Sequence, residues 1–520
     1  MSKKPFNLFE YILTYHRGAF ATLVLIPISV LYATYLSLRH KLVFMLNTAP
    51  KEHEKRVAKI IQQVKTWADS GSTQKLTTSR SGWFTMSELV PAYKKTNYAI
   101  DLNMRDIIHI DYEKRTIKVE PLVDMGQITA TLNARGWTLQ VVPELDNLTV
   151  GGLINGFGIE SSSHKYGLFQ YTIESIDIVT ADGSFKHCSA TENETLFYNI
   201  PWSHGTLGFL VCAELRIIPC TPYVEIKYQP LFGLDTIVHQ FEAASRDINN
   251  QFVELLQYSK EEAVLMTGKF AENTFDKSKI NRIGRFYTSW FYKQVQQYLI
   301  HKTIGVEYIP LRDYYHRHTR SLFWEMEEVI PFGNSPWFRY LLGWALPPQL
   351  SLMKYFETET TRALREKHHI VQDMLMPISL LHKSLMYFEE EYQVYPLWIC
   401  PMLVKSYPND YGFIHPYKNE RGELDELYVD IGAYGSPKKK DFDGNTALAK
   451  LENFVIDHKG FQALYARTLM NKEQFRRMFT HQSYDALRKE MPLCTRAFSE
   501  VYDKVGGTAR VAPVTYKKNK

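Results

Sequence analysis

Cysteine is scarce in this chain of 520 residues, and its scarcity excludes several classes of protein. There are five cysteines, an odd number, and they do not have the spacing of a metal-binding set. A disulfide framework is therefore not expected, and a reducing compartment is favoured. The net charge is also low, at +5, so the composition gives no reason to expect a nucleic-acid partner.

Charged residues are missing altogether from residues 18–38, which read GAFATLVLIPISVLYATYLSL. A run of this length can cross a bilayer as one helix, and a proline such as Pro27 is tolerated in such helices. A cleaved signal peptide is the alternative, but no small-residue cleavage site follows the run. We predict one membrane span near residues 18–38. Basic residues flank both of its ends and therefore assign no orientation.

The chain ends in a short basic tail, KKNK, at residues 517–520. Lys517 and Lys518 resemble a dilysine retrieval signal, which is read on the cytosolic side of the endoplasmic reticulum. An ordinary solvated tail is the alternative. Together with the apolar run and the scarce cysteines, the tail predicts a single-pass protein of the endoplasmic reticulum membrane with a cytosolic catalytic domain. The Golgi membrane is the alternative location.

Short periodic patterns predict a chain that mixes helices and strands. Residues 51–70 predict an amphipathic helix whose apolar face includes Ile60 and Trp67. Further strands are expected at residues 98–102, 116–120, 176–180 and 223–228, and further helices at residues 125–134 and 234–244.

Four glycines fall within eight positions, at Gly151, Gly152, Gly156 and Gly158. Glycine lets a backbone approach a ligand closely, and successive free N–H groups can bind an anion. Ser161 occupies the third glycine position of a dinucleotide-binding fingerprint, so the run favours phosphate binding without a simple Rossmann unit. A glycine-rich turn between two packed elements is the alternative.

The segments on either side of this run occur in a characteristic order. Upstream lies TTSRSG at residues 77–82, and downstream lie VTADG at 179–183, GTLG at 205–208 and ELRIIP at 214–219. In order and spacing this set resembles the PCMH-type FAD-binding domain of the vanillyl-alcohol-oxidase class, over residues 51–219.

A second set of motifs resembles one family within that class over nearly the whole chain. The set comprises PELDNL at 143–148, GIESSSHKYG at 158–167, YYHRHTR at 314–320, DIGAYG at 430–435 and LYA at 464–466. These motifs are similar to those of the Δ24-sterol reductases.

The resemblance implies an α+β fold: a PCMH-type two-subdomain FAD-binding fold with an α+β substrate (cap) domain and an N-terminal transmembrane helix. It divides the chain into an anchor (1–50), an FAD-binding domain (51–221) and a substrate domain (222–520) whose C-terminal part returns to the flavin domain. The residues that match the cofactor-binding motifs are Thr78, Ser79, Arg80, Ser81, Gly82, Thr149, Val150, Gly151, Gly152, Leu153, Ile154, Asn155, Gly156, Phe157, Gly158, Ile159, Glu160, Ser161, Tyr166 and Gly167. The first loop departs from the pattern at Ser81, where glycine is frequent. It contains no histidine or cysteine, so non-covalent FAD is expected.

The activity that the resemblance implies is NADPH-dependent reduction of the Δ24 double bond of a sterol side chain, at a membrane. No separate dinucleotide fingerprint is present, so NADPH is expected to reduce the flavin at its open face. A flavin-dependent oxidase of alcohols or sugar acids on the same fold is one alternative. A non-catalytic, sterol-binding membrane protein is another. Neither the preferred Δ24 sterol nor an oligomeric state has a signal in the sequence.

This chemistry requires a proton donor, because an isolated trisubstituted alkene accepts hydride only once it is protonated. Protonation at C24 leaves a tertiary cation at C25, which hydride can quench in a dry, aromatic-lined pocket. Tyr314, Tyr315, His316 and His318 are the predicted donors, since they place ionisable groups among aromatic residues. A surface helix or a contact between domains is the alternative for this run. Histidines two positions apart lie on different helix faces, and no third ligand is evident, so no metal is expected.

Overall fold

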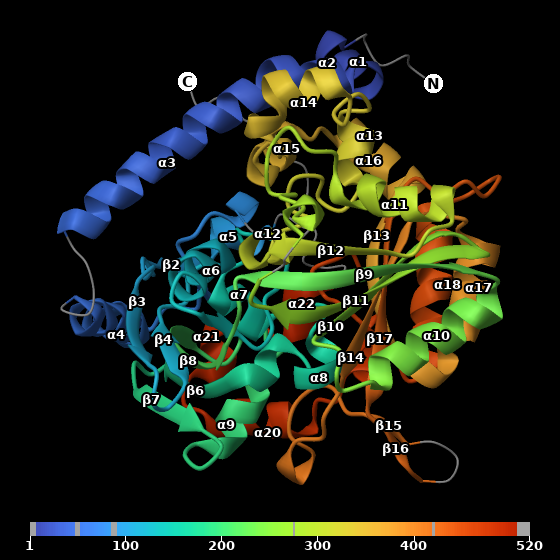
Figure 1. Cartoon of the computed structure of the whole chain (residues 1–520). Helices are drawn as coiled ribbons and strands as arrows, with labels where there is room; N and C mark the ends of the chain where they lie inside the picture. Colours follow the sequence, from blue (N-terminus) through green and yellow to red (C-terminus); the bar gives the residue numbers. More distant parts are fainter. Residues whose placement is uncertain (1–6, 47–51, 85–90, 274–275, 419–421, 507–520) are drawn as a thin grey trace.

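The structure is a computed structural model that describes residues 7–46, 52–84, 91–273, 276–418 and 422–506. Two β-sheets form the body, and a helical N-terminal segment lies along one side of it (Figure 1). Lys517 and Lys518, on which the predicted retrieval signal rests, lie outside the described residues.

The first sheet is formed by the chain up to residue 219. Its six strands run in the order β3-β4-β8-β6-β7, with β5 paired to β8, and every pairing is antiparallel. The strands are β3 (Ile107–Asp111), β4 (Thr116–Val119), β5 (Trp137–Leu139), β6 (Ile173–Val179), β7 (Phe185–Ser189) and β8 (Phe209–Pro219). A separate parallel pair consists of β1 (Leu76–Thr78) and β2 (Tyr98–Ile100). The helices of this region are α4 (His53–Asp69), η2 (Gly82–Phe84), α5 (Tyr93–Thr96), α6 (Met125–Asn133), α7 (Val150–Asn155), α8 (Ser163–Tyr166), η3 (Phe169–Thr172) and α9 (Glu194–Asn199).

The second sheet is formed by the chain after residue 222. β8 ends at Pro219 and β9 begins at Tyr223, so the predicted domain boundary at residue 221 falls in the link between the sheets. The second sheet has eight strands in the order β12-β9-β11-β10-β14-β17-β13-β18, all antiparallel. They are β9 (Tyr223–Phe232), β10 (Phe252–Ser259), β11 (Glu262–Ala271), β12 (Gly305–Pro310), β13 (Ile370–Pro377), β14 (Leu397–Leu403), β17 (Leu427–Gly435) and β18 (Phe461–Gln462).

Three groups of helices accompany this sheet. Helices α10 (Leu234–Arg246), α11 (Phe291–His301), α17 (Leu381–Glu391) and α18 (Gly444–Asp457) pack directly on its strands. The insertion between β12 and β13 forms α12 (Leu311–Tyr315), α13 (Glu325–Val329), α14 (Pro336–Leu342), η5 (Gly343–Ala345), α15 (Leu350–Phe356) and α16 (Glu359–His368). The last helices are α19 (Lys472–Met478), α20 (Gln482–Glu490), α21 (Cys494–Ala497) and α22 (Val501–Val505). They bring the chain back to the first sheet's side, where Arg488 donates a hydrogen bond of 2.8 Å to the carbonyl of Thr206.

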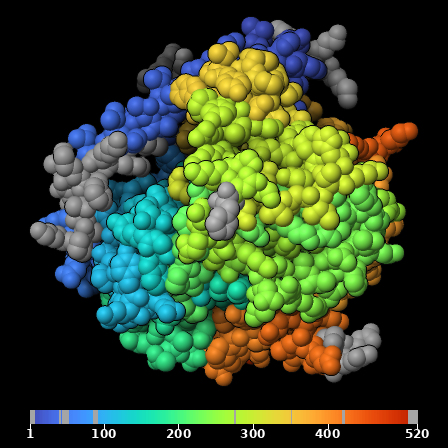
Figure 2. Space-filling view, viewed as in Figure 1, coloured from blue at the N-terminus to red at the C-terminus, as the bar shows by residue number. Residues whose placement is uncertain are grey.

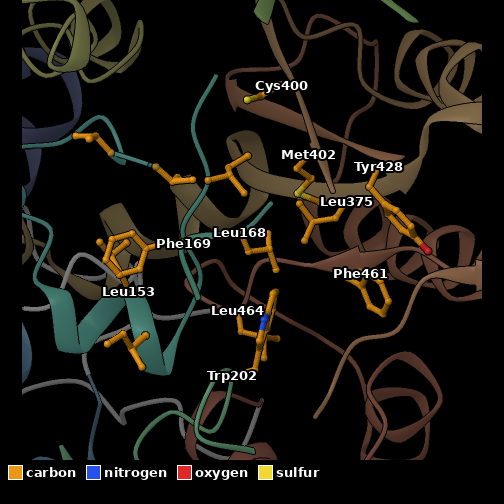
Figure 3. Packing of buried hydrophobic residues seen from close by; sticks show 14 of the residues in the cluster. Leu153, Leu168, Phe169, Trp202, Leu375, Cys400, Met402, Tyr428, Phe461 and Leu464 are labelled. Atoms are coloured by element: carbon orange, nitrogen blue, oxygen red, sulfur yellow. The ribbon is translucent and has the colours of Figure 1, made fainter. Parts of the chain in front are cut away.

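The two sheets share one hydrophobic core. Leu153, Leu168 and Trp202 approach it from the first half of the chain, and Leu375 and Met402 approach it from the second sheet (Figure 3). All five side chains are almost completely buried. Burial of apolar area on this scale is the main favourable contribution to folding, and here it ties both halves into one unit.

A buried ion-pair cluster also joins the two halves. The guanidinium of Arg317 donates hydrogen bonds to Glu254 at 2.7 and 2.8 Å and to Glu160 at 2.6 Å. Glu160 belongs to the glycine-rich region and Glu254 to β10, and all three side chains are 0% exposed. Because buried charges must be paired and hydrogen-bonded, this cluster fixes how one half of the molecule sits on the other.

The N-terminal segment comprises α1 (Leu8–Tyr15), α2 (Arg17–Phe20), the π-helical turn η1 (Ala21–Leu25) and α3 (Ile26–Leu46). Arg17–Tyr35 is long and apolar enough to cross a membrane. Pro27, the second residue of α3, lacks a backbone N–H, and its ring crowds the turn before it. That preceding turn is the widened π-helical turn η1. Part of this segment packs on the protein, because Ala21 and Leu25 lie in a small buried cluster with Phe338 and Leu352.

We predict that Arg317→Ala lowers the free energy of unfolding by about 3–5 kcal/mol, because two carboxylates are then left buried without a cation. The measurement is a denaturant titration of wild type and variant. Arg216→Ala is the control, since Arg216 pairs with Glu174 on the surface and should lose about 1 kcal/mol or less. Equal losses in the two variants would contradict the role given to Arg317.

Candidate active site

One cavity of about 850 Å³ is bounded by both halves of the molecule and by the N-terminal segment. The glycine run contributes Gly152 to its wall, and the second sheet contributes Asp373, Trp398 and Tyr434. Phe20 and its neighbours on the N-terminal helices close another part. A large, mostly apolar cavity with a few polar groups is the usual form of a small-molecule site.

The glycines in and just after α7 are required for different purposes. A side chain at Gly151 would meet Pro121 at 2.9 Å, and one at Gly158 would meet Leu153 at 2.8 Å, so these two positions allow close packing within the protein. Gly152 differs, because a Cβ there would approach only Thr149 Oγ1, at 3.1 Å, and Gly152 lines the cavity. The missing side chain of Gly152 therefore keeps space open for a ligand.

Arg80 connects the first predicted loop to this run. It follows β1, its Nη1 donates to Thr149 Oγ1 at 3.5 Å, and its Nη2 donates to the carbonyl of Phe84 at 3.1 Å. Lys94 lies on α5, and its Nζ donates to the carbonyl of Thr78 at 2.7 Å. Both cations thus contact neutral oxygens.

Lys504, at the end of α22, completes a group of three cations with Arg80 and Lys94. Its Nζ donates to the carbonyl of His204 at 2.6 Å. Burial, Lys504 and Arg80 lower the pKa of Lys94 to about 7. Burial and Arg488 lower the pKa of Lys504 to about 8. Burial and the nearby Arg105 lower the pKa of Arg80 to about 10.

This cradle fits the pyrophosphate of FAD, the cofactor that the fold class implies. Among the described residues, the three cations donate hydrogen bonds to neutral oxygens, so an anion bound between them would add counter-charge. Gly152 leaves room for that anion beside the backbone. The residues present therefore suit the cofactor.

A buried acid lies on another wall of the cavity. Asp373 on β13 accepts hydrogen bonds from the hydroxyls of Tyr434, at 2.5 Å, and Tyr465, at 2.7 Å. Burial raises the pKa of Asp373 to about 6, although the two tyrosines partly oppose the rise. All three side chains line the cavity.

Strand register explains why these groups meet. Asp373 on β13 pairs with Gly432 on β17, and a side chain at Gly432 would meet Tyr434 at 2.5 Å and Asp373 at 3.0 Å. Glycine at this position leaves the space in which the tyrosine hydroxyl reaches the carboxylate. Glu144 also lines the cavity, and burial together with Glu160 raises the pKa of Glu144 to about 8.

The two tyrosines predicted as donors are buried outside the cavity lining. The hydroxyl of Tyr314 lies 2.9 Å from Ser161 Oγ, and Thr138 Oγ1 donates to the Tyr315 hydroxyl at 2.9 Å. Burial raises the pKa of both phenols well above the ordinary value. Both side chains connect the cap to the first half of the molecule.

The two histidines predicted as donors are likewise buried outside the cavity lining. His316 Nε2 lies 2.9 Å from Thr129 Oγ1, and His318 Nε2 lies 3.4 Å from Glu254. Burial lowers the pKa of both imidazoles, and that of His318 to about 4. His318 stacks on Phe323, which lines the cavity, at 4.3 Å. A donor among these four residues stays a prediction, but their packing favours the contact between domains that the sequence leaves open.

The predicted cofactor residues divide into two groups. Those that line the cavity are Arg80, Thr149, Gly152, Leu153, Gly156, Phe157, Gly158 and Ile159. Those outside its lining are Thr78, Ser79, Ser81, Gly82, Val150, Gly151, Ile154, Asn155, Glu160, Ser161, Tyr166 and Gly167. Several in the second group support the first, as when Thr78 holds Lys94 and Asn155 accepts a hydrogen bond from the backbone of Gly205.

Sequence reasoning missed Lys94, Lys504, Asp373 and Trp398. The two lysines lie far from the glycine run in sequence, and neither belongs to a motif. Tyr434 and Tyr465, which donate hydrogen bonds to Asp373, occur in two segments that resemble the Δ24-sterol reductases. These two segments were the only indication in the sequence of a site around Asp373.

The comparisons with known proteins first define a class. Residues 57–189 match the family described as "FAD binding domain". This match confirms the PCMH-type, α+β fold and the FAD-binding class of the protein.

The full-length relatives then define the family. The chain is 50% identical to the Delta(24)-sterol reductase of Rattus norvegicus over 501 residues, which are 96% of this chain and 95% of the relative. The same identity and coverage hold for the Delta(24)-sterol reductase of Homo sapiens. The Delta(24)-sterol reductase homolog of Caenorhabditis elegans is 40% identical over 96% of each chain. The chain belongs to the Δ24-sterol reductase family.

We predict that Gly152→Val yields folded protein without flavin, because the added side chain fills the space beside the cofactor rather than a packed contact. The measurement is flavin absorbance per protein, with circular dichroism to verify folding. Gly158→Val is the contrast variant, since its side chain would overlap Leu153 and should lower thermal stability. Full flavin content in Gly152→Val would contradict the cradle. Flavin that stays with acid-precipitated wild-type protein would contradict non-covalent binding.

We also predict that flavin affinity falls as pH rises from about 7 to 9. Lys94 and Lys504 lose their protons in this range, and only their cationic forms attract a pyrophosphate. Lys504→Gln should weaken flavin binding about tenfold at pH 7, and its affinity should depend less on pH. The exposed Lys489→Gln is the control. A pH-independent wild-type affinity, measured by flavin fluorescence, would contradict the role of these lysines.

Proposed function

We propose that the protein is an FAD-dependent reductase that uses NADPH to reduce the Δ24 double bond of a sterol side chain, as the desmosterol-to-cholesterol type of reaction does. One observation carries this proposal: a single cavity joins the glycine-and-cation cradle to a buried acid flanked by two tyrosines. The family membership supports the substrate class.

Asp373 is the group that we assign as proton donor, in addition to the four residues predicted from the sequence. A pKa near 6 lets a carboxylic acid hold its proton for a useful part of the time near neutral pH. Tyr434 and Tyr465 orient the carboxyl group through their hydrogen bonds. The proton would form the C24–H bond with the π electrons of the alkene, which leaves C25 cationic.

The aromatic wall suits that developing cation. Trp398 and Phe323 line the cavity beside Tyr434, and aromatic faces attract positive charge. Trp398 is held in place because its Nε1 donates to Glu254 at 2.9 Å. Burial of the surrounding side chains excludes water, which would otherwise add to C25.

FAD, when bound, supplies the hydride that completes the C25–H bond. NADPH is the proposed source of those electrons, and no second nucleotide site is needed if it meets the flavin directly. One NADPH and one proton are consumed for each double bond reduced.

We propose the endoplasmic reticulum membrane as the location, with the catalytic domain on the cytosolic side. The apolar helix supports membrane association. The cytosolic side rests on the five unpaired cysteines.

The test of function is a two-step anaerobic assay. NADPH should bleach the flavin of the purified protein, and added desmosterol should restore its colour with one sterol reduced per flavin. Solvent hydrogen should appear at C24 and flavin-derived hydrogen at C25. Rapid reoxidation by oxygen with no effect of desmosterol would instead favour an oxidase, and a protein without flavin would favour a sterol-binding role.

We predict that Asp373→Asn slows flavin reoxidation by desmosterol at least about 100-fold, the usual scale of a lost general acid, and leaves reduction by NADPH unchanged. In wild type the reoxidation rate should fall as pH rises above about 6, because the donor must be protonated. Exposed Asp441→Asn is the control. Tyr314→Phe, Tyr315→Phe, His316→Ala and His318→Ala test the other donors. One of these four variants, rather than Asp373→Asn, could lose flavin reoxidation by desmosterol while it keeps flavin reduction by NADPH. That result would identify the substituted residue as the proton donor.

A further inference from the structure

We propose that the N-terminal segment and the α14–η5–α15 helices form one surface that lies flat on an anionic lipid bilayer and passes the sterol from the lipid directly into the cavity. The binding part of this proposal is independent of the catalytic activity, whereas the delivery part rests on the proposed function.

The N-terminal segment is fixed to the body of the protein along one face. Gln349 donates its backbone N–H to Ser29 Oγ at 2.9 Å, and Thr360 donates to Glu10 at 3.0 Å. Phe20 packs edge-on against Phe356 at 5.5 Å. A Cβ at Gly18 would lie 3.3 Å from Phe332, so the backbone approaches the cap closely there. These contacts extend from α1 into α3, so they hold the first part of the apolar run alongside the cap.

The opposite face of the same segment is apolar and exposed. Leu23 is 74% exposed and Leu31 is 71% exposed, and Tyr35, Leu38 and Leu42 continue the stripe at intervals of three or four residues. A stripe of large apolar side chains in water is unfavourable, and this one continues the face of a helix already packed on protein.

The cap helices extend this apolar surface. Trp337, Tyr340 and Leu341 on α14 and Trp344 on η5 are all more than half exposed. The other face of α14 buries Phe338 against the N-terminal segment. Figure 2 shows the first helices and α14 side by side on the same rim of the molecule. Tryptophan and tyrosine are the residues that proteins place at the boundary between lipid headgroups and acyl chains.

The charge of the surface selects the kind of lipid. Neither residues 11–51 nor residues 329–356 contain an aspartate or glutamate, and residues 277–306, whose loop packs beside α14, contain none either. Arg282 and Arg285 are exposed on that loop, where Tyr287 stacks on Tyr340 at 5.7 Å. The neighbouring Glu328 and Glu357 are paired with arginines. The three stretches themselves therefore carry cations without carboxylates, which attracts anionic headgroups.

The cavity begins at this surface. Leu13, Thr14 and Phe20 of the N-terminal helices form part of its wall, together with Met353 and Phe356 of α15. A sterol is soluble in lipid and almost insoluble in water, so a wall shared by cavity and bilayer provides a direct path. The proposal departs here from the membrane span predicted from the sequence. The packed face favours an in-plane helix, because a crossing helix would lose the contacts of Ala21 and Leu25 with the protein.

The first experiment measures binding of the purified holoenzyme to vesicles of phosphatidylcholine with 30% phosphatidylserine, by co-flotation. The triple variant Trp337→Ser/Leu341→Ser/Trp344→Ser keeps the N-terminal segment. Its affinity for the vesicles should fall by at least about tenfold. Ile248→Ser/Phe185→Ser, two exposed apolar positions elsewhere, is the matched control and should bind as wild type does. Vesicles without phosphatidylserine should bind wild type more weakly. Unchanged binding of the triple variant would overturn the proposal.

The second experiment measures depth with spin labels on Cys substitutions at Leu23, Leu31, Leu38 and Leu341. An in-plane segment places all four labels at a similar, shallow depth. A crossing helix instead places the label at position 31 deepest and the one at position 341 in water, which would overturn the proposal.

The third experiment separates delivery from catalysis. The triple variant should show a higher apparent KM for desmosterol in vesicles, and an unchanged one when cyclodextrin presents the sterol. An unchanged KM in vesicles would overturn the delivery step. A wild-type protein that binds vesicles but reduces no sterol from either source would overturn the proposed function and leave the membrane surface standing.

Discussion

The pairing of Arg317 with Glu160 and Glu254 is the interaction on which the rest of the site depends. A buried guanidinium or carboxylate costs several kcal/mol unless its partners are in place, so this cluster admits only one arrangement of the two sheets. Glu160 directly follows the glycine run, and Glu254 holds the indole of Trp398. The same ion pairs therefore set the distance between the cradle and the aromatic wall, although none of the three charged groups lines the cavity.

The cavity itself separates two kinds of electrostatic environment. Arg80 and Lys504 place positive charge at one wall, and Lys94 lies close to both. Burial first, and neighbouring cations second, lower the pKa values of all three. Asp373 lies among apolar and phenolic groups at another wall, where burial favours its protonated form. Proton donor and anion site must be kept apart, because a cation beside Asp373 would lower its pKa and remove the proton that the chemistry requires.

Local patterns could be predicted from the sequence, and contacts between distant segments could not. The periodic burial of Val57, Ile60, Val64 and Trp67 was readable, and the predicted helix at 51–70 is observed at His53–Asp69. The glycine run was also readable, because its residues are adjacent.

The cap behaved differently. Most of its strands pair with partners far away in sequence, and the pairing of Asp373 with Gly432 arises from sheet register alone. The run at 314–320 places ionisable and aromatic residues next to one another, yet its hydrogen-bond partners include Ser161, Thr138 and Glu254. Adjacency in sequence therefore indicated chemistry at a place where packing is the more direct explanation.

The membrane segment and the chemistry impose one requirement together. A tertiary cation at C25 is captured by any water molecule that reaches it, so the cavity must be closed on every side while the proton and hydride arrive. The sheets and the cap form most of its wall, and Phe20, Ala21 and Leu25 of the N-terminal segment form another part. An apolar segment that only anchored the protein would need no such contacts. Because it forms a wall of the cavity, the surface that meets the lipid is also part of the enclosure that keeps the reaction dry.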